Sequence, residues 1–281
     1  MPPKTSLLDL HDEHIIRILS QLDMKTLAFI RQSCYILHWY GLLVLDMRYD
    51  SLLRPYVSSP GDFRRLLDKH NAFIGGSTAL EFFLGGIDWK PNDLDIFVRA
   101  DTVVAFFNYF RGQGYNRVAP WEDNLLSARR VPCTEASLRL VKGCRSVDII
   151  ITSLDSPLDP IMHTWATVVM NALSGSRAVC SYPHETINHE ALVTRPKSVA
   201  LQWTSISNEQ EKYESRNFRI VDHRGHPDMP ASCRHVADNR CLVVYFHGLA
   251  RTTMNFWGYR QRWLRDATHH TSTIMWYEHK N

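Results

Sequence analysis

The chain has 281 residues, of which 44% are hydrophobic and 22% charged, so it can bury a core in one large domain or two smaller ones. Its 32 lysines and arginines against 29 acids give a formal charge of +3, which does not indicate nucleic-acid binding. No apolar run approaches the roughly 18–20 residues that a membrane-spanning helix needs. We therefore expect a globular protein that neither crosses a membrane nor binds nucleic acid.

The first predicted elements are short helices within residues 6–50. Apolar residues recur at the spacing of one helical face, at Ile15, Ile18, Leu19 and Leu22. Residues 23–26 interrupt this pattern before Leu27 and Ile30 resume it, so we expect two or three helices joined by tight turns. Turn-forming residues at 58–61 mark the expected end of this segment.

From residue 60 onward, strands and helices are predicted to alternate. We expect strands at residues 71–75, 94–98, 137–141, 147–152 and 242–246. We expect helices at residues 77–84, 102–111 and 160–173. This order indicates an α/β (α+β) fold over residues 60–250, with a mixed sheet flanked by helices. Residues 251–281 show no clear period and are expected to form an irregular or helical extension.

The six cysteines show no CxxC pair and no regular spacing, and the N-terminus lacks the pattern of a secretory signal. Because disulfides are rare in reducing compartments, we expect reduced thiols in an intracellular protein, cytoplasmic or nuclear. The cysteines are Cys34, Cys133, Cys144, Cys180, Cys233 and Cys241.

A glycine turn follows the first predicted strand. Gly75 and Gly76 lack a Cβ, which lets the backbone turn sharply and approach a ligand closely. Ser77 stands where the next helix begins, so we expect its hydroxyl and the first amide groups of the helix to face outward beside the positive end of the helix dipole. These three residues therefore form a candidate site for a phosphate group.

Three aspartates lie on two of the predicted strands. Side chains alternate along a strand, so Asp93 and Asp95 share one face while Leu94 and Ile96 fill the other. Asp148 lies among branched apolar residues, where a charge is costly unless it is paired or coordinated. Neighbouring carboxylates repel each other, and a divalent cation such as Mg²⁺ relieves that repulsion. We therefore predict that these aspartates bind Mg²⁺.

Each motif alone also has an ordinary structural explanation. A Gly-Gly turn before a helix is common, and an Asp-x-Asp pair at the start of a strand is typical of a cap or an exposed edge. Asp148 has an alternative partner in Arg139 or Arg145, with which it would form a structural salt bridge. The occurrence of all three motifs in this order favours a functional site.

The order of these motifs resembles the nucleotidyltransferase superfamily, which has a Gly-Gly/Ser turn, an Asp-x-Asp pair and a later third acid. Over roughly residues 70–246 the chain is also similar to a group of fungal nucleotidyltransferase-like proteins, in stretches such as VDIIITSLDSPLDP and KYESRNF. The resemblance implies that Asp93, Asp95 and Asp148 hold Mg²⁺ while Gly75, Gly76 and Ser77 bind the triphosphate of a nucleotide. An acceptor hydroxyl would then attack the α-phosphorus, and pyrophosphate would leave.

The N-terminal segment resembles an F-box. Residues 10–13, Leu-His-Asp-Glu, stand where that family has Leu-Pro-x-Glu, and apolar residues from Ile15 onward match its pattern. The resemblance implies binding to the Skp-type adaptor of a cullin ubiquitin ligase, through Leu10, Ile15, Leu19 and Leu22. The alternative is a helical cap that only packs on the next domain.

These observations leave three hypotheses open. The first is a Mg²⁺-dependent enzyme that transfers a nucleotidyl group from a nucleoside triphosphate to an acceptor. The second is an adaptor protein that recruits targets to a ubiquitin ligase through a catalytically inactive nucleotidyltransferase-like domain. The third is a pseudoenzyme that still binds Mg²⁺ and nucleotide without turnover.

Overall fold

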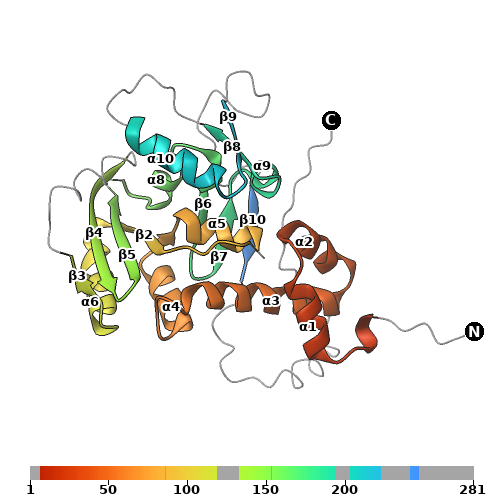
Figure 1. Cartoon of the computed structure of the whole chain (residues 1–281). Helices are drawn as coiled ribbons and strands as arrows, with labels where there is room; N and C mark the ends of the chain where they lie inside the picture. The colour runs from red at the N-terminus through yellow and green to blue at the C-terminus, as the bar shows by residue number, and fades with distance from the viewer. Residues whose placement is uncertain are drawn as a thin grey trace, which may run out of the picture.

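The structure, a computed structural model, describes residues 7–85, 87–118, 133–152, 154–193, 203–222 and 241–246. It has a mixed α/β fold in which helices flank a large mixed sheet, as the sequence predicts (Figure 1). The sheet contains, in spatial order, β10 (Leu242–Tyr245), β7 (Arg177–Cys180), β6 (Asn171–Leu173), β1 (Phe73–Ile74), β2 (Asp93–Arg99), β5 (Arg145–Thr152), β4 (Thr134–Lys142) and β3 (Asn116–Arg117). The predicted extension at 251–281 lies outside the described residues.

The central strands pair in both directions. β2 and β5 are parallel, whereas β1 pairs antiparallel with β2, and β4 pairs antiparallel with β5. The turn between β4 and β5 falls at Gly143 and Cys144, inside the predicted turn, and Gly143 has a φ of +58° that favours glycine. A second sheet consists of the parallel strands β8 (Glu190–Val193) and β9 (Arg219–Asp222).

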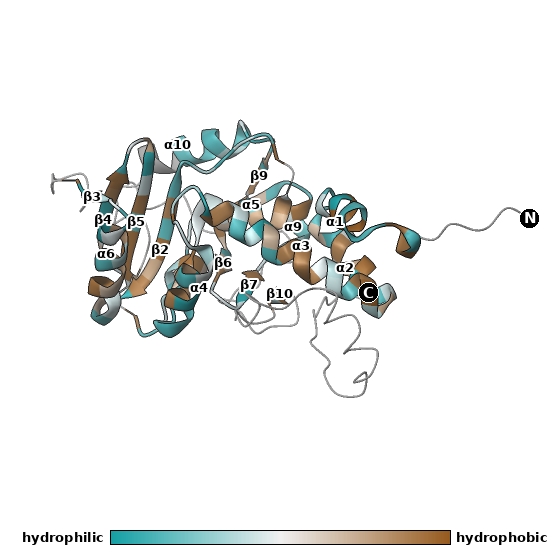
Figure 2. Cartoon of the chain, turned by 90° about the horizontal axis from the view of Figure 1, so that it is seen from below, coloured by the Kyte–Doolittle hydropathy of each residue, from teal (hydrophilic) through white to brown (hydrophobic). Residues whose placement is uncertain are grey.

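The N-terminal segment forms three helices, α1 (Asp12–Ser20), α2 (Met24–Ser33) and α3 (Tyr35–Leu53). Asp23 caps α2, because its carboxylate accepts a hydrogen bond from the Thr26 amide at 2.8 Å. In Figures 1 and 2, α1 and α2 lie at the opposite end of the molecule from β3 and β4, and α3 runs back toward the sheet. None of the described helices combines the length and the apolar composition that a bilayer crossing requires.

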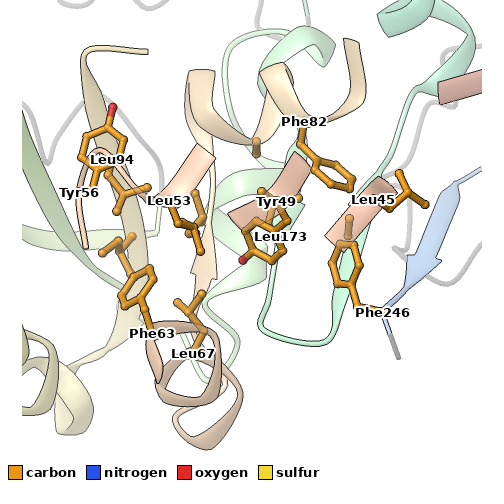
Figure 3. Packing of buried hydrophobic residues seen from close by; sticks show 14 of the residues in the cluster. Leu45, Tyr49, Leu53, Tyr56, Phe63, Leu67, Phe82, Leu94, Leu173 and Phe246 are labelled. Carbon is orange, nitrogen blue, oxygen red and sulfur yellow. The ribbon is translucent and has the colours of Figure 1, made fainter. Parts of the chain in front are cut away.

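A single apolar cluster joins the N-terminal helices to the sheet. Ile15 and Leu19 of α1 belong to the same cluster as Ile74 of β1 and Phe82 of α5 (Gly76–Leu84). Tyr49 of α3 lies at its centre, with its ring centroid 5.9 Å from that of Phe82 and 5.2 Å from that of Phe246 (Figure 3). Burial on this scale dominates folding stability, so α3 acts as part of the core of the sheet layer.

The remaining helices cover the two faces of the large sheet. On the face that belongs to the main apolar cluster lie α4 (Pro60–Lys69) and α6 (Val103–Gly112). The short helix α8 (Leu158–Met162) packs against β2 and β6 through the other face. α9 (Pro183–Ile187) precedes β8, and α10 (Trp203–Glu214) precedes β9; α10 is mostly hydrophilic (Figure 2).

One predicted element is wrong. The helix expected over 160–173 is instead α8, a 3-10 turn at Thr167–Val169, and strand β6. All three residues of β6 are buried, and the strand pairs with both β1 and β7 in the middle of the sheet. The hairpin with β7 and the long-range pairing with β1 outweigh the local helical pattern.

Candidate metal and nucleotide site

The parallel pairing of β2 with β5 brings three aspartates together. Asp95 and Asp148 are direct partners in the register, and Asp93 precedes Asp95 by two residues on the same strand. One carboxylate oxygen from each of the three lies within 4.8 Å of the others. We call this cluster of Asp93, Asp95 and Asp148 the acidic site.

Strand alternation determines which way the aspartates point. The alternate residues Leu94, Ile96 and Val98 of β2 are fully buried in the main apolar cluster, as are Val147 and Ile149 of β5. The aspartates therefore lie on the opposite face of the sheet, as predicted for Asp93 and Asp95. Only two strands are needed to build the cluster, because parallel partners in register present their side chains on the same face.

The glycine turn between β1 and α5 closes one side of the acidic site. The Gly75 amide donates a hydrogen bond to the Asp95 carbonyl at 3.0 Å. Gly76 is the first residue of α5 and has a φ of +61°, and a Cβ at this position would collide with Oδ2 of Asp95. Glycine is therefore required here both for its backbone conformation and for the close approach of the carboxylate.

Ser77 does not face outward as predicted. It is 3% exposed, as part of a helix in which every residue from Ser77 to Leu84 is buried. α5 is buried because its side chains belong to two different apolar clusters. The next residue, Thr78, donates its hydroxyl hydrogen to the Asp93 carbonyl at 3.1 Å and so ties the start of α5 to β2. Thr78 was missed in the sequence, since a threonine in the first turn of a helix carries no signal of a tertiary partner.

The charges at the acidic site are unbalanced. Burial raises the pKa of Asp95 well above its ordinary value of 3.8, and the neighbouring charges of Asp93 and Asp148 raise it further. Lys212 of α10 opposes this rise in the pKa of Asp95, which places a cation of α10 near the cluster. Lys212 comes from a distant part of the chain, and only the folded structure identifies it.

Arg139 neutralises one of the three carboxylates. It stands directly opposite Asp148 in the β4–β5 register and binds it through two hydrogen bonds, Nε to Oδ1 at 2.8 Å and Nη2 to Oδ2 at 2.5 Å. The Asp148 side chain is 13% exposed and that of Arg139 47% exposed. Of the two alternative partners named from the sequence, Arg139 is thus the one that pairs, whereas Arg145 donates to the Pro91 carbonyl at 3.3 Å.

The residues assigned to adaptor binding lie mostly inside the fold. Ile15 and Leu19 are 1% and 0% exposed, and Leu10 and Leu22 are partly buried against the same apolar cluster. The exposed apolar side chains of the first two helices are Ile18, 43% exposed, and Phe29, 47% exposed. Any partner of this segment in the described conformation would meet these two residues.

Comparison with known proteins adds no assignment. No family model matches the chain, and no curated protein matches it. The chemistry of the site therefore has to be inferred from its own residues: three converging carboxylates, a glycine turn at a helix N-terminus and two nearby cations.

Proposed function

We propose that the protein is a Mg²⁺-dependent nucleotidyltransferase, in which Asp93, Asp95 and Asp148 are the catalytic and metal-binding residues. The observation that carries this proposal is the convergence of the three carboxylates within 4.8 Å, beside the first turn of α5. The substrate would be a nucleoside triphosphate, whose nucleotidyl group passes to an acceptor hydroxyl. None of the described cysteines, Cys34, Cys133, Cys144, Cys180 and Cys241, forms a disulfide bond, which fits the intracellular setting that we propose.

The donor set suits Mg²⁺. This ion prefers oxygen ligands and is usually bound by a few carboxylates together with substrate phosphates. Burial raises the pKa of Asp95, and repulsion by Asp93 and Asp148 raises it further; a divalent cation relieves this repulsion. When bound, Mg²⁺ would neutralise phosphate charge and help to orient the reacting oxygens.

The protein groups around the acids suit a triphosphate. Gly76, which is half-buried, places the backbone at the N-terminus of α5, where the amides of the first turn and the helix dipole favour an anion. Lys212 adds a positive charge that acts on Asp95, although Lys212 also pairs with Glu209 at 3.3 Å, whose charge acts on Asp95 in the opposite sense. Ser77 is buried, so in the described conformation its contribution to nucleotide binding would come through its backbone amide.

Binding and transfer should be tested separately on the full chain. We expect calorimetry to detect Mg²⁺-dependent binding of a non-hydrolysable ATP analogue, and we expect α-labelled nucleotide to be transferred to an acceptor in a cell extract. Asp93→Asn with Asp95→Asn should abolish both. Asp101→Asn is the matched control, because this exposed acid pairs with Arg99 outside the acidic site.

The outcomes separate the hypotheses. Binding without transfer would indicate a pseudoenzyme, and neither binding nor transfer would refute the proposal. Transfer that persists in the double variant would show that other residues perform the reaction.

A second candidate function is adaptor binding by α1 and α2. The exposure of Ile18 and Phe29 on neighbouring helices favours it, since large apolar side chains at a surface often mark an interface.

We expect a Skp-type adaptor to be captured by the wild type and lost with Ile18→Asp and Phe29→Asp. Val104→Asp is the control, because Val104 is 65% exposed on α6. Substituting Ile15 would be uninformative, since it would disrupt the core. Failure of the wild type to capture the adaptor would exclude this function.

A further inference from the structure

A pocket that does not include the acidic site lies between the N-terminal helices and the residues just before β2. Its volume is about 550 Å³, within the range of roughly 300–1,000 Å³ that is typical of small-molecule sites. α1 and α3 form one wall, and the other contains the C-terminal half of α5, Gly85, Lys90 and Pro91. Arg145, at the start of β5, completes the lining. We call this the helical pocket.

A buried carboxylate in the helical pocket lacks a full set of partners. Glu81 is 5% exposed, and its Oε1 accepts a hydrogen bond from Nζ of Lys90 at 2.6 Å. Its Oε2 is buried and has no hydrogen-bond partner within the structure described. Because an unpaired buried oxygen is costly, a small movement of the Glu81 side chain toward the pocket would let a ligand N–H or O–H group supply the missing donor.

Two arginines add positive charge to the same pocket. Arg48 donates to the Leu22 carbonyl at 2.8 Å and to the Phe82 carbonyl at 3.4 Å, which uses two of the five N–H donors of a guanidinium group. Its guanidinium packs against Gly85, whose φ of +60° and missing Cβ make room for it. The Arg145 guanidinium lies 5.6 Å from the centroid of the Tyr56 ring.

The charge balance of the helical pocket favours an anion. Arg48, Lys90 and Arg145 outnumber the one acid of the lining, Glu81, which pairs with Lys90; Asp23, outside the lining, offsets part of the charge of Arg48. Beside these charges, α1 and α3 contribute apolar side chains, Ile16, Val44 and Leu52. A ligand that matches this lining has an acidic group and an apolar body, together with one hydrogen-bond donor for Glu81.

We propose that the helical pocket binds a small organic anion of this kind: a carboxylate, sulfonate or phosphate on an apolar body that also carries an N–H or O–H group. The proposal does not depend on the acidic site or on nucleotidyl transfer. The site joins both parts of the chain, because α1 and α3 supply the apolar wall while α5 and β5 supply Glu81 and Arg145.

The dye 8-anilinonaphthalene-1-sulfonate is a suitable probe, since it combines a sulfonate, an aromatic body and one N–H group. We expect saturable binding to the full chain at one site, followed by fluorescence. The neutral analogue N-phenyl-1-naphthylamine has the same body without the sulfonate, and we expect it to bind at least roughly tenfold more weakly because it loses the charged hydrogen bonds. Equal binding of the two dyes would overturn the proposal.

Two variants locate the binding site. Ser51→Trp places a large side chain in the lining of the pocket and should abolish saturable binding. Arg145→Gln should weaken binding of the sulfonate dye roughly tenfold, whereas Arg111→Gln, which removes an equal charge from α6, should leave it unchanged. Thermal unfolding of each variant checks that the fold is intact. Unchanged dye binding in both Ser51→Trp and Arg145→Gln would refute the proposal.

Competition then identifies the source of the anion. Displacement of the dye by 10-hydroxydecanoate, which carries an O–H group, would indicate a lipid-type carboxylate, and displacement by indole-3-acetate, which carries an N–H group, would indicate an aromatic carboxylate. Displacement by inorganic phosphate alone, at equal concentration, would contradict the requirement for an apolar body.

Discussion

The two faces of β2 and β5 differ in polarity at the positions of the acidic site. On one face, Leu94, Ile96 and Ile149 are fully buried in the main apolar cluster. On the other face, the intervening residues Asp95 and Asp148 belong to the acidic site. Residues that are neighbours in sequence thus belong to environments of opposite polarity, because successive side chains of a strand point to opposite sides.

In β2 and β5, one face therefore stabilises the fold, and the other carries the candidate site. The apolar face supplies burial, and this allows the other face to keep charges that repel one another. Substitutions at adjacent positions should therefore change the free energy of unfolding in opposite directions.

The largest effect is expected on the apolar face. Ile96→Ala should lower the free energy of unfolding by about 2–5 kcal/mol, because it removes buried methyl groups and leaves a cavity. Urea denaturation measures this value. Val104→Ala, at an exposed apolar position, should change it by less than about 0.5 kcal/mol. A small effect at Ile96 would contradict its place in the core.

The glycine turn should show the next largest effect. Gly76→Ala should cost about 1–2 kcal/mol for the left-handed backbone alone, and more for the collision with Asp95. The control is Gly112→Ala at the end of α6, where an added Cβ meets no atom within 4 Å. That change should be neutral or stabilising by up to about 1 kcal/mol. Equal effects of the two substitutions would show that Asp95 does not lie against the turn.

On the acidic face, removal of a charge should stabilise the protein. Asp95→Asn should raise the urea midpoint at pH 7 in the absence of divalent cations, because burial, Asp93 and Asp148 disfavour the charged form of Asp95. The opposite sign from Ile96→Ala, one residue away, would be the clearest demonstration of the contrast between the faces.

The same substitution predicts a pH dependence. The pKa of Asp95 is raised in the folded state, so its contribution to stability is complete below its ordinary pKa of 3.8 and is lost as the pH rises through the raised value. The stability of the wild type should therefore fall relative to Asp95→Asn as the pH increases from 4 to 8. Parallel curves for the two proteins would contradict the raised pKa.

The smallest effect is expected from Arg139. This cation competes with any metal for Asp148, so Arg139→Gln should tighten Mn²⁺ binding about three- to tenfold, as measured by electron paramagnetic resonance titration. Arg99→Gln is the control, because Arg99 is 44% exposed and pairs with Asp101. Unchanged Mn²⁺ affinity in Arg139→Gln would mean that Asp148 is not a ligand.

Local sequence patterns predicted the secondary-structure elements that depend on neighbouring residues alone. The acids of β2, the turn at 142–145 and the strand at 242–246 follow from alternation and turn chemistry, and the structure confirms these elements. β6 was predicted as helix because its strand state depends on a hairpin with the next strand, β7, and on pairing with β1, which is distant in sequence.

Several features of the acidic site depend on strand register and tertiary packing, which the sequence alone does not predict. Whether Arg139 or Arg145 pairs with Asp148 is decided by the register of β4 against β5. The burial of Ser77 follows from the packing of both sides of α5. Lys212, whose charge lowers the pKa of Asp95, lies on α10, far from β2 in the sequence.

The ion pair between β4 and β5 also bears on the order of folding. A hairpin forms from neighbouring segments within about 1–10 μs, whereas the parallel pairing of β2 with β5 closes a long loop and is intrinsically slower. Arg139 lies within the hairpin and can neutralise Asp148 before β2 arrives with Asp93 and Asp95. When β2 pairs with β5, it then meets one unpaired carboxylate fewer, which lowers the electrostatic barrier to this pairing.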